Sequence, residues 1–398
     1  MVKWDFFHPR EKFLILEITP KGTNGLFLSV DEDRNIVFEK LIEGAPLAKF
    51  LKSPARRVSE KTWEGRHFFR SRRRVIAAAD SSLATTIPVP LKLSREHANM
   101  KSRITIAELE NLIAQAMAKV FNGCRNEAAK RLAASDLDAV LVGAKADHFA
   151  VDGRALASPV GVAGKKISLL LEFTFATRRI FEDLKPFFNS PQEFFFAEAP
   201  QAHLRAIARV QKLPLNLIAA GDEGASLFIL ERPKGEYAVL YRERFPWSFS
   251  SLLGNIREAF AVNEEAAKKL YCLYHRGLVS ENAKRAFQKI VEPALQAFFG
   301  EIAKGKIKGA VYSDMPHALP ISLPHKHGAA TLVRHPAKEI LAELGFTLPA
   351  HGPKEKSRMD REDNTIPRML LYFVEAYFDK SNSEINRKLR RRLHWLAG

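Results

Sequence analysis

Two stretches of the chain share one arrangement of apolar and polar positions. Residues 13–30 and residues 215–230 each contain an apolar run, a short polar turn with glycine, and a second apolar run. A third run follows each pair, at residues 35–40 and 236–245. Short apolar runs that are bounded by glycine or proline favour strands over helices. The repeated pattern therefore predicts two hairpins of one design, and with them a duplicated fold that has a cleft between its halves.

A helical period appears between the hairpins and after them. Residues 104–120 place apolar side chains such as Leu109 and Ile113 on one face. Thr105 is expected to cap this helix, with Glu108 completing a capping box. Further helices are expected at residues 177–188, 200–211, 280–300 and 366–378, and further strands at residues 75–79, 85–91, 139–142 and 146–151.

Two other passages carry a more specific order of residues. One is a turn-rich segment before a long apolar strand, and it contains Val151, Asp152, Gly153, Pro159, Gly161 and Gly164. The other is a helix, a short cap and a second helix, and it contains Val262, Glu264, Glu265, Ala266 and Leu270. Together with the hairpins, which are similar to the two phosphate loops of the actin-like ATPase superfamily, these passages resemble the FtsA family of bacterial cell-division proteins. The pilus assembly protein PilM is a near relative of that family.

The resemblance implies an α/β, two-lobed actin-like (ribonuclease H-like) fold with an inserted SHS2-type subdomain in the first lobe. The expected boundaries are a first lobe with the first hairpin at 1–91, the inserted subdomain at 92–176, helices that link the lobes at 177–212, a second lobe at 213–350 with a helical subdomain at about 250–305, a loop and helix that return to the first lobe at 351–378, and a linker with an amphipathic helix at 379–398.

The hairpin turns are the candidate nucleotide site. Gly221 and Gly224 allow a turn to direct backbone N–H groups at phosphate oxygens, although an ordinary hairpin has the same composition. The resemblance implies phosphate or Mg²⁺ contacts at Glu17, Lys21, Gly22, Thr23, Gly221, Gly224 and Ser226.

The same loops depart from the family pattern. Glu17 stands for the family's aspartate, and Pro20 has no N–H to donate. Asp222 and Glu223 place negative charge where a triphosphate would lie, and residues 313–316 replace a glycine-rich adenosine loop. We expect weak or absent binding of ATP with Mg²⁺, no useful hydrolysis and no catalytic residues, with an active ATPase as an alternative.

The C-terminal residues form a basic amphipathic pattern after a polar linker at 379–382. On a helix, the apolar residues share one arc and the basic residues take the other faces. Such a helix suits an anionic bilayer surface, and the FtsA family ends in one. A helix that packs on its own protein, or a basic tail for nucleic acid, has the same composition. The expected membrane-binding residues are Ile385, Arg387, Lys388, Leu389, Arg390, Arg391, Arg392, Leu393, Trp395 and Leu396.

The net charge of +17 indicates an acidic partner or an acidic surface. The sequence has no zinc-finger or other nucleic-acid motif, so we do not expect nucleic acid as the partner, although the arginines within residues 56–74 keep it as an alternative. Cys124 and Cys272 lack metal or redox spacing, which favours a reducing cytosol. Four histidines at residues 317–335 match no common metal site and are expected at the surface.

The first expectation for function is therefore an FtsA-like protein of the septum, cytoplasmic and peripheral on the inner face of the bacterial membrane. It would tether an FtsZ-like polymer to the anionic membrane surface through the C-terminal helix and self-associate into filaments. The alternative is a PilM-like cytoplasmic scaffold for the assembly of type IV pili or a secretion machine.

Overall fold

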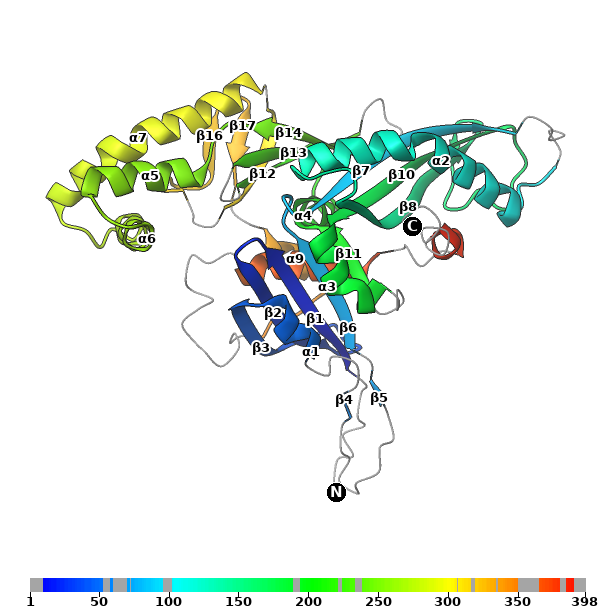
Figure 1. The fold of residues 1–398 in the computed structure, drawn as a ribbon, viewed down its shortest axis with the longest axis horizontal. Helices are drawn as coiled ribbons and strands as arrows, with labels where there is room; N and C mark the ends of the chain where they lie inside the picture. Colours follow the sequence, from blue (N-terminus) through cyan, green and yellow to red (C-terminus); the bar gives the residue numbers. More distant parts are fainter. Residues whose placement is uncertain are drawn as a thin grey trace.

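The structure is a computed structural model (Figure 1). It describes residues 10–52, 58–59, 70–71, 73–95, 102–188, 194–220, 224–232, 238–305, 307–315, 319–333, 336–349, 365–379 and 384–389.

The first sheet begins as a meander and is extended by two parallel strands. Its order is β11-β6-β1-β2-β3. The strands β1, β2 and β3 pair antiparallel in sequence, while β6 lies parallel to β1 and β11 lies parallel to β6. Their bounds are β1 Glu11–Thr19, β2 Gly22–Val30, β3 Ile36–Ala45, β6 Arg73–Ala79 and β11 Phe194–Glu198.

The second sheet repeats this topology. Its order is β14-β13-β12-β15-β17-β16, in which β12, β13 and β14 form the meander and β15 and β17 add parallel strands. The short β16 is an added antiparallel edge. The predicted duplication and the two-lobed, actin-like α/β fold are thus confirmed. The bounds are β12 Leu215–Ala220, β13 Ala225–Glu231, β14 Val239–Phe245, β15 Gly309–Asp314, β16 His325–His327 and β17 Ala330–Leu332.

Between β6 and β11 in the sequence, the chain forms a separate four-stranded sheet of order β7-β10-β8-β9, on which the long helix α2 packs (Figure 1). This unit, residues 84–177, is called the inserted subdomain below. Apolar residues of α2, such as Leu109 and Ile113, share one buried core with β10 residues such as Leu169 and Phe173. Its elements are β7 Ala84–Ser94, α2 Ile106–Arg131, β8 Ala139–Val151, β9 Arg154–Ala155 and β10 Lys166–Thr177.

Two helices join the lobes. α4 (Ala199–Ile207) and α9 (Thr365–Tyr377) pack on each other, and their buried residues share one core with both large sheets. Strand β1 is buried on both faces, because Phe13 and Ile15 face this core while Leu14 and Leu16 face a second one. The remaining elements are α1 Leu47–Lys52, β4 Val58–Ser59, β5 Arg70–Ser71, α3 Arg178–Phe188, α5 Phe249–Phe260, α6 Glu264–His275, α7 Glu281–Lys304 and α8 Ala337–Glu343.

Several local predictions need correction. Strand β11, which lies between α3 and α4, was not expected, and β8 is one strand rather than two. The capping box of α2 is half formed: the Thr105 hydroxyl accepts the Glu108 N–H, but the Glu108 carboxylate accepts two hydrogen bonds from Arg95 instead. The loop that was expected at the start of residues 351–378 lies outside the described residues, which resume at residue 365.

Candidate functional site

Strand topology brings two carboxylates together between the lobes. Glu17 lies near the carboxyl end of β1 and Asp314 at the carboxyl end of β15. Each strand is central in its sheet, and the carboxyl ends of such strands face the crevice where ligands bind in open α/β folds. Glu17 is only 4% exposed, so its carboxylate needs partners within the protein.

One buried arginine supplies a partner to both carboxylates. Arg368 of α9 donates from Nε to Glu17 Oε1 at 2.8 Å and from Nη2 to Glu17 Oε2 at 3.1 Å. Its Nη1 donates to Asp314 Oδ1 at 3.0 Å. Burial lowers the pKa of Arg368, but Glu17 and Asp314 outweigh burial and hold that pKa well above its ordinary value. The guanidinium therefore stays charged and bridges the two lobes.

Two further groups complete the hydrogen bonds of Glu17. Asn24 Nδ2 donates to Glu17 Oε2 at 2.9 Å, and the Tyr372 hydroxyl donates to Oε1 at 3.2 Å. Burial and the nearby Glu17 raise the pKa of Tyr372 well above its ordinary value, so the phenol remains a donor. The carboxylate of Glu17 thus accepts hydrogen bonds from three side chains.

Three predicted phosphate residues, Lys21, Gly22 and Thr23, lie at the turn of the first hairpin. Thr19 pairs with Gly22 in the ladder, so the turn contains only Pro20 and Lys21. Thr23 is buried, and Lys21 Nζ lies 3.8 Å from the carboxylate of Glu264 in α6. This loop and the neutralised carboxylates do not fit a Mg²⁺–nucleotide complex.

The second hairpin is described in part. Ser226 lies in β13, and its hydroxyl accepts a hydrogen bond from Arg242 Nε at 3.3 Å. Gly224 directly precedes that strand, whereas Gly221, Asp222 and Glu223 lie outside the described residues.

A second buried carboxylate lies close to Arg242. Glu198, at the end of β11, accepts the Thr86 N–H at 2.8 Å and lies 3.4 Å from Arg242 Nη1. Burial raises the pKa of Glu198 to about 7, although Arg242 and the Thr86 N–H act to lower it. This side chain consequently titrates near neutral pH.

The described part of the C-terminal helix, residues 384–389, docks on the protein itself. Ile385 and Leu389 are buried in the core of the inserted subdomain, which differs from the exposed apolar face expected for membrane binding. Arg387 is exposed, and Lys388 Nζ pairs with Glu110 of α2 at 3.3 Å. The other expected membrane-binding residues, Arg390, Arg391, Arg392, Leu393, Trp395 and Leu396, lie outside the described residues.

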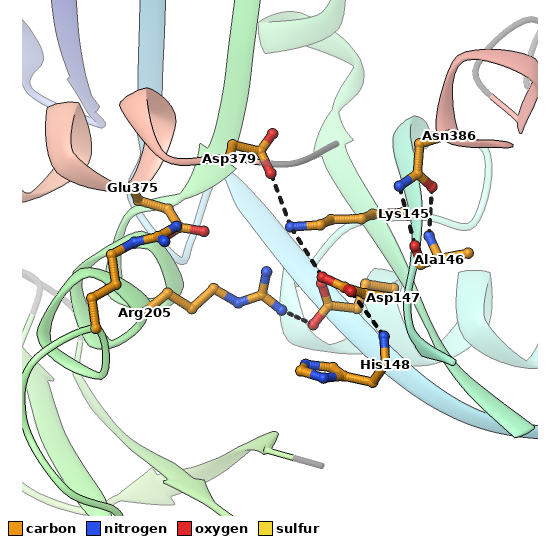
Figure 2. Close-up of polar contacts among 10 residues, drawn as sticks. Lys145, Ala146, Asp147, His148, Arg205, Glu375, Asp379 and Asn386 are labelled. Atoms are coloured by element: carbon orange, nitrogen blue, oxygen red, sulfur yellow. Dashed lines mark hydrogen bonds and ion pairs between the residues drawn. The ribbon is translucent and has the colours of Figure 1, made fainter. Parts of the chain in front are cut away.

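A polar network surrounds this docked segment (Figure 2). Lys145 of β8 lies between Asp379, at 2.9 Å, and Asp147, at 3.7 Å. Burial lowers the pKa of Lys145, but the carboxylates, Asp379 foremost, outweigh burial and raise it. Arg205 of α4 pairs with Glu172 of β10 and so ties the inserted subdomain to the helices between the lobes.

The residues that sequence analysis missed are chiefly Arg368, Tyr372 and Asn386. Arg368 and Tyr372 belong to a helix whose sequence is largely apolar, and Asn386 directly follows the apolar residue Ile385. The charged residues Arg368 and Glu375 inside a largely apolar helix were the available signal, because each needs a partner when it is buried. His325 and His327, expected at the surface, are partly buried, with both rings packed on Phe299.

Within the described ranges, every helix is too short or too polar to cross a bilayer. No protein-family model matches the sequence, and no curated protein is significantly similar to it. Among solved structures, the chain is similar to a protein of the PilM–PilN type IV pilus biogenesis complex, with 15% identity over 93% of this chain and 98% of the other, and a TM-score of 0.46.

Two other similarities are more distant. The ethanolamine utilization protein EutJ of Carboxydothermus hydrogenoformans is 14% identical over 46% of this chain and 56% of its own, with a TM-score of 0.25. An actin-like ATPase-fold protein of unknown function from Bacteroides thetaiotaomicron is 10% identical over 66% and 81%, with a TM-score of 0.30. Because all three scores are low, the fold assignment rests on the repeated strand topology described above.

Proposed function

We propose that this protein is a non-hydrolysing actin-fold scaffold that organises protein partners at the cytoplasmic face of a membrane. The observation that carries the proposal is the position of Arg368, whose guanidinium bonds both Glu17 and Asp314 between the lobes. In a Mg²⁺-dependent site, carboxylates at such strand ends are available to the ion or to its water shell. In this protein the buried guanidinium of Arg368 already neutralises both Glu17 and Asp314.

Displacing that cation is costly. Arg368 is buried and charged, and removing one partner of a buried ion pair leaves an uncompensated charge. A metal–nucleotide complex would have to separate Arg368 from two carboxylates and reshape the two-residue turn at Pro20. The contact of Arg368 with both carboxylates therefore serves as a structural link between the lobes, and the activity that we propose for the protein is to bind partners.

Calorimetric titration with Mg-ATP tests this proposal, with the Glu17→Gln variant as the matched control. We expect no heat of binding up to millimolar nucleotide and no shift in melting temperature. Binding that requires Mg²⁺ and disappears in Glu17→Gln would overturn the proposal. Heat that survives in Glu17→Gln and vanishes at high salt would reflect the net charge of +17 alone.

As the cellular role of this scaffold, we favour a PilM-like part in the assembly of a type IV pilus or secretion apparatus. The supporting observation is the burial of Ile385 and Leu389, which makes the start of the C-terminal helix part of the folded protein. An FtsA-like tether for an FtsZ-type polymer, with self-association into filaments, is the second candidate. The basic residues of the sequence from Arg387 onward support it.

Recruitment of a purified FtsZ-type polymer to anionic vesicles separates the two candidates. A division tether brings the polymer to the vesicles only when the full-length protein is present. A variant with Arg390, Arg391 and Arg392 replaced by glutamine serves as the control. We expect no recruitment, and recruitment that the control variant abolishes would favour the division role.

A further inference from the structure

The segment that follows α9 lies on the inserted subdomain as a strap, here defined as residues 379 and 384–389. Leu389 is fully buried and Ile385 is 7% exposed. Both belong to the same core as Leu109 and Ile113 of α2. The side of the strap that faces the protein is thus the apolar side of the C-terminal helix.

Three polar contacts hold the strap in place. Asp379 pairs with Lys145 at 2.9 Å, and Lys388 pairs with Glu110 at 3.3 Å. Between them, Asn386 Oδ1 accepts the N–H of Ala146 at 2.8 Å, while Asn386 Nδ2 donates to the carbonyl oxygen of Ala146 at 3.1 Å. Figure 2 shows the Asn386 amide facing the backbone of Ala146, beside Lys145.

The two hydrogen bonds of Asn386 satisfy backbone groups at the edge of strand β8. Ala146 is paired with Leu171 of β10, but its N–H and carbonyl group both bond Asn386, on the other side of β8. An antiparallel strand directs both backbone groups of alternate residues to one side. The Asn386 amide therefore takes the place of a neighbouring strand at this point and covers part of an open edge.

The strap keeps charge on its outer side. Arg387 is exposed while its neighbours in the sequence, Asn386 and Lys388, face the inserted subdomain. An anionic surface can therefore approach Arg387 while the strap is docked. Ile385 and Leu389 cannot enter that surface at the same time, because both are buried in the core that they share with α2.

We propose that the strap is a reversible internal ligand of the inserted subdomain, and that docking competes with an anionic lipid bilayer for Ile385 and Leu389. In the docked state Ile385 and Leu389 are buried, while Arg387 faces outward. Release exposes an amphipathic helix of the kind that lies on anionic membranes. Such a competition is additional to the scaffold function and applies to either candidate role, pilus assembly or cell division.

A variant on the inserted subdomain tests the competition without changing the helix. Glu110→Lys replaces the partner of Lys388 with a like charge and should weaken docking. Glu127→Lys is the matched control, because it makes the same charge change on the same helix at a residue that pairs with Arg131. Binding is measured by co-sedimentation with vesicles of phosphatidylglycerol and phosphatidylethanolamine, and with phosphatidylcholine vesicles as the neutral surface.

We expect Glu110→Lys to bind the anionic vesicles several-fold more than the wild type and Glu127→Lys, with none binding phosphatidylcholine. Equal binding by all three proteins, or an equal gain in both variants, would overturn the proposal.

Hydrogen exchange of the unmodified protein gives a second test, which does not depend on how a variant folds. The amide of Ala146 should exchange faster when anionic vesicles are added, because its acceptor Asn386 leaves. Unchanged exchange at Ala146 in vesicle-bound protein would also overturn it. Neither result depends on the nucleotide experiment, so the two proposals fail separately.

Discussion

At the scale of single residues, the buried ionisable groups define how the contact between Glu17, Arg368 and Asp314 differs from a nucleotide site. Glu17 is bonded by Arg368, Asn24 and Tyr372, so its negative charge is fully engaged within the protein. The fork of a guanidinium suits this position because it can bond one carboxylate with two nitrogens and still reach a second. Lysine at the same position would offer a point charge and could not reproduce that pattern.

Glu198 makes the stability of the protein depend on pH near neutrality. The pKa of this carboxyl is about 7 in the folded protein against an ordinary 4.5, because it is buried. The folded state therefore binds the proton more tightly than the unfolded state, and stability falls as pH rises from 4.5 through 7. From the size of the shift, the loss is about 3 kcal/mol.

The variant Glu198→Gln should abolish this dependence, because glutamine keeps an oxygen for the Thr86 N–H and carries no charge to bury. Urea unfolding across this pH range measures the effect as the difference between wild type and variant. Glu231→Gln, at an exposed position of β13, is the control and should leave the wild-type profile unchanged. A wild-type profile that runs parallel to that of Glu198→Gln would contradict the assignment.

At the scale of elements, the sequence predicted what local patterns determine. Both hairpins, the turn at Asp152 and Gly153, and the cap at Thr105 occur where the pattern indicated. Strand β11 could not be recognised, because a five-residue apolar run between two helices has no period long enough to separate strand from helix.

The candidate site was less predictable, for a physical reason. Arg368 meets Glu17 and Asp314 only through the packing of α9 between the lobes, and the three residues are far apart in the sequence. Asn386 bonds Ala146 through the same kind of long-range packing. The pattern of the C-terminal residues predicted an amphipathic helix. Whether the apolar face of that helix contacts lipid or protein depends on tertiary structure, which the local pattern does not determine.

The cap of α6 provides a test at this scale. The Asn263 side chain accepts the N–H of Ala266 at 2.9 Å, which satisfies one of the free donors at the start of the helix. Asn263→Ala should lower the free energy of unfolding by about 1 kcal/mol. The same substitution at Asn255, exposed within α5, should be neutral or slightly stabilising, because alanine is the better helix former. Equal effects of the two substitutions in chemical denaturation would refute the role of the cap.

At the scale of the whole molecule, the two lobes share an apolar core and are also joined by the polar contact of Arg368 with Glu17 and Asp314. α4 and α9 share a core with both large sheets, and Arg368 of α9 bonds a carboxylate in each sheet, Glu17 of β1 and Asp314 of β15. A second tie, from Arg242 of β14 to Glu198 of β11, also crosses between the lobes. The lobes are consequently coupled by buried polar contacts, whereas the exposed pair of Lys21 and Glu264 contributes little.

The variant Arg368→Met tests this coupling, because methionine fills similar space but leaves Glu17 and Asp314 without their cation. Breaking a buried ion pair from one side should cost about 3–5 kcal/mol in the free energy of unfolding. Arg244→Met, at an exposed position of β14, should cost far less. Adding Glu17→Gln and Asp314→Asn to Arg368→Met should recover part of the loss, because no unpaired carboxylate then remains buried.

Hydrogen exchange shows whether the loss spreads across the joint. If Arg368 couples the lobes, exchange in Arg368→Met rises both in β1 of the first sheet and in β15 of the second, since the guanidinium bonds a residue at the end of each strand. A purely local role would raise exchange in α9 and β1 while β15 stayed as in the wild type. Faster exchange in both strands, together with recovery in the triple variant, would identify the Arg368 contact as the one that couples the two lobes.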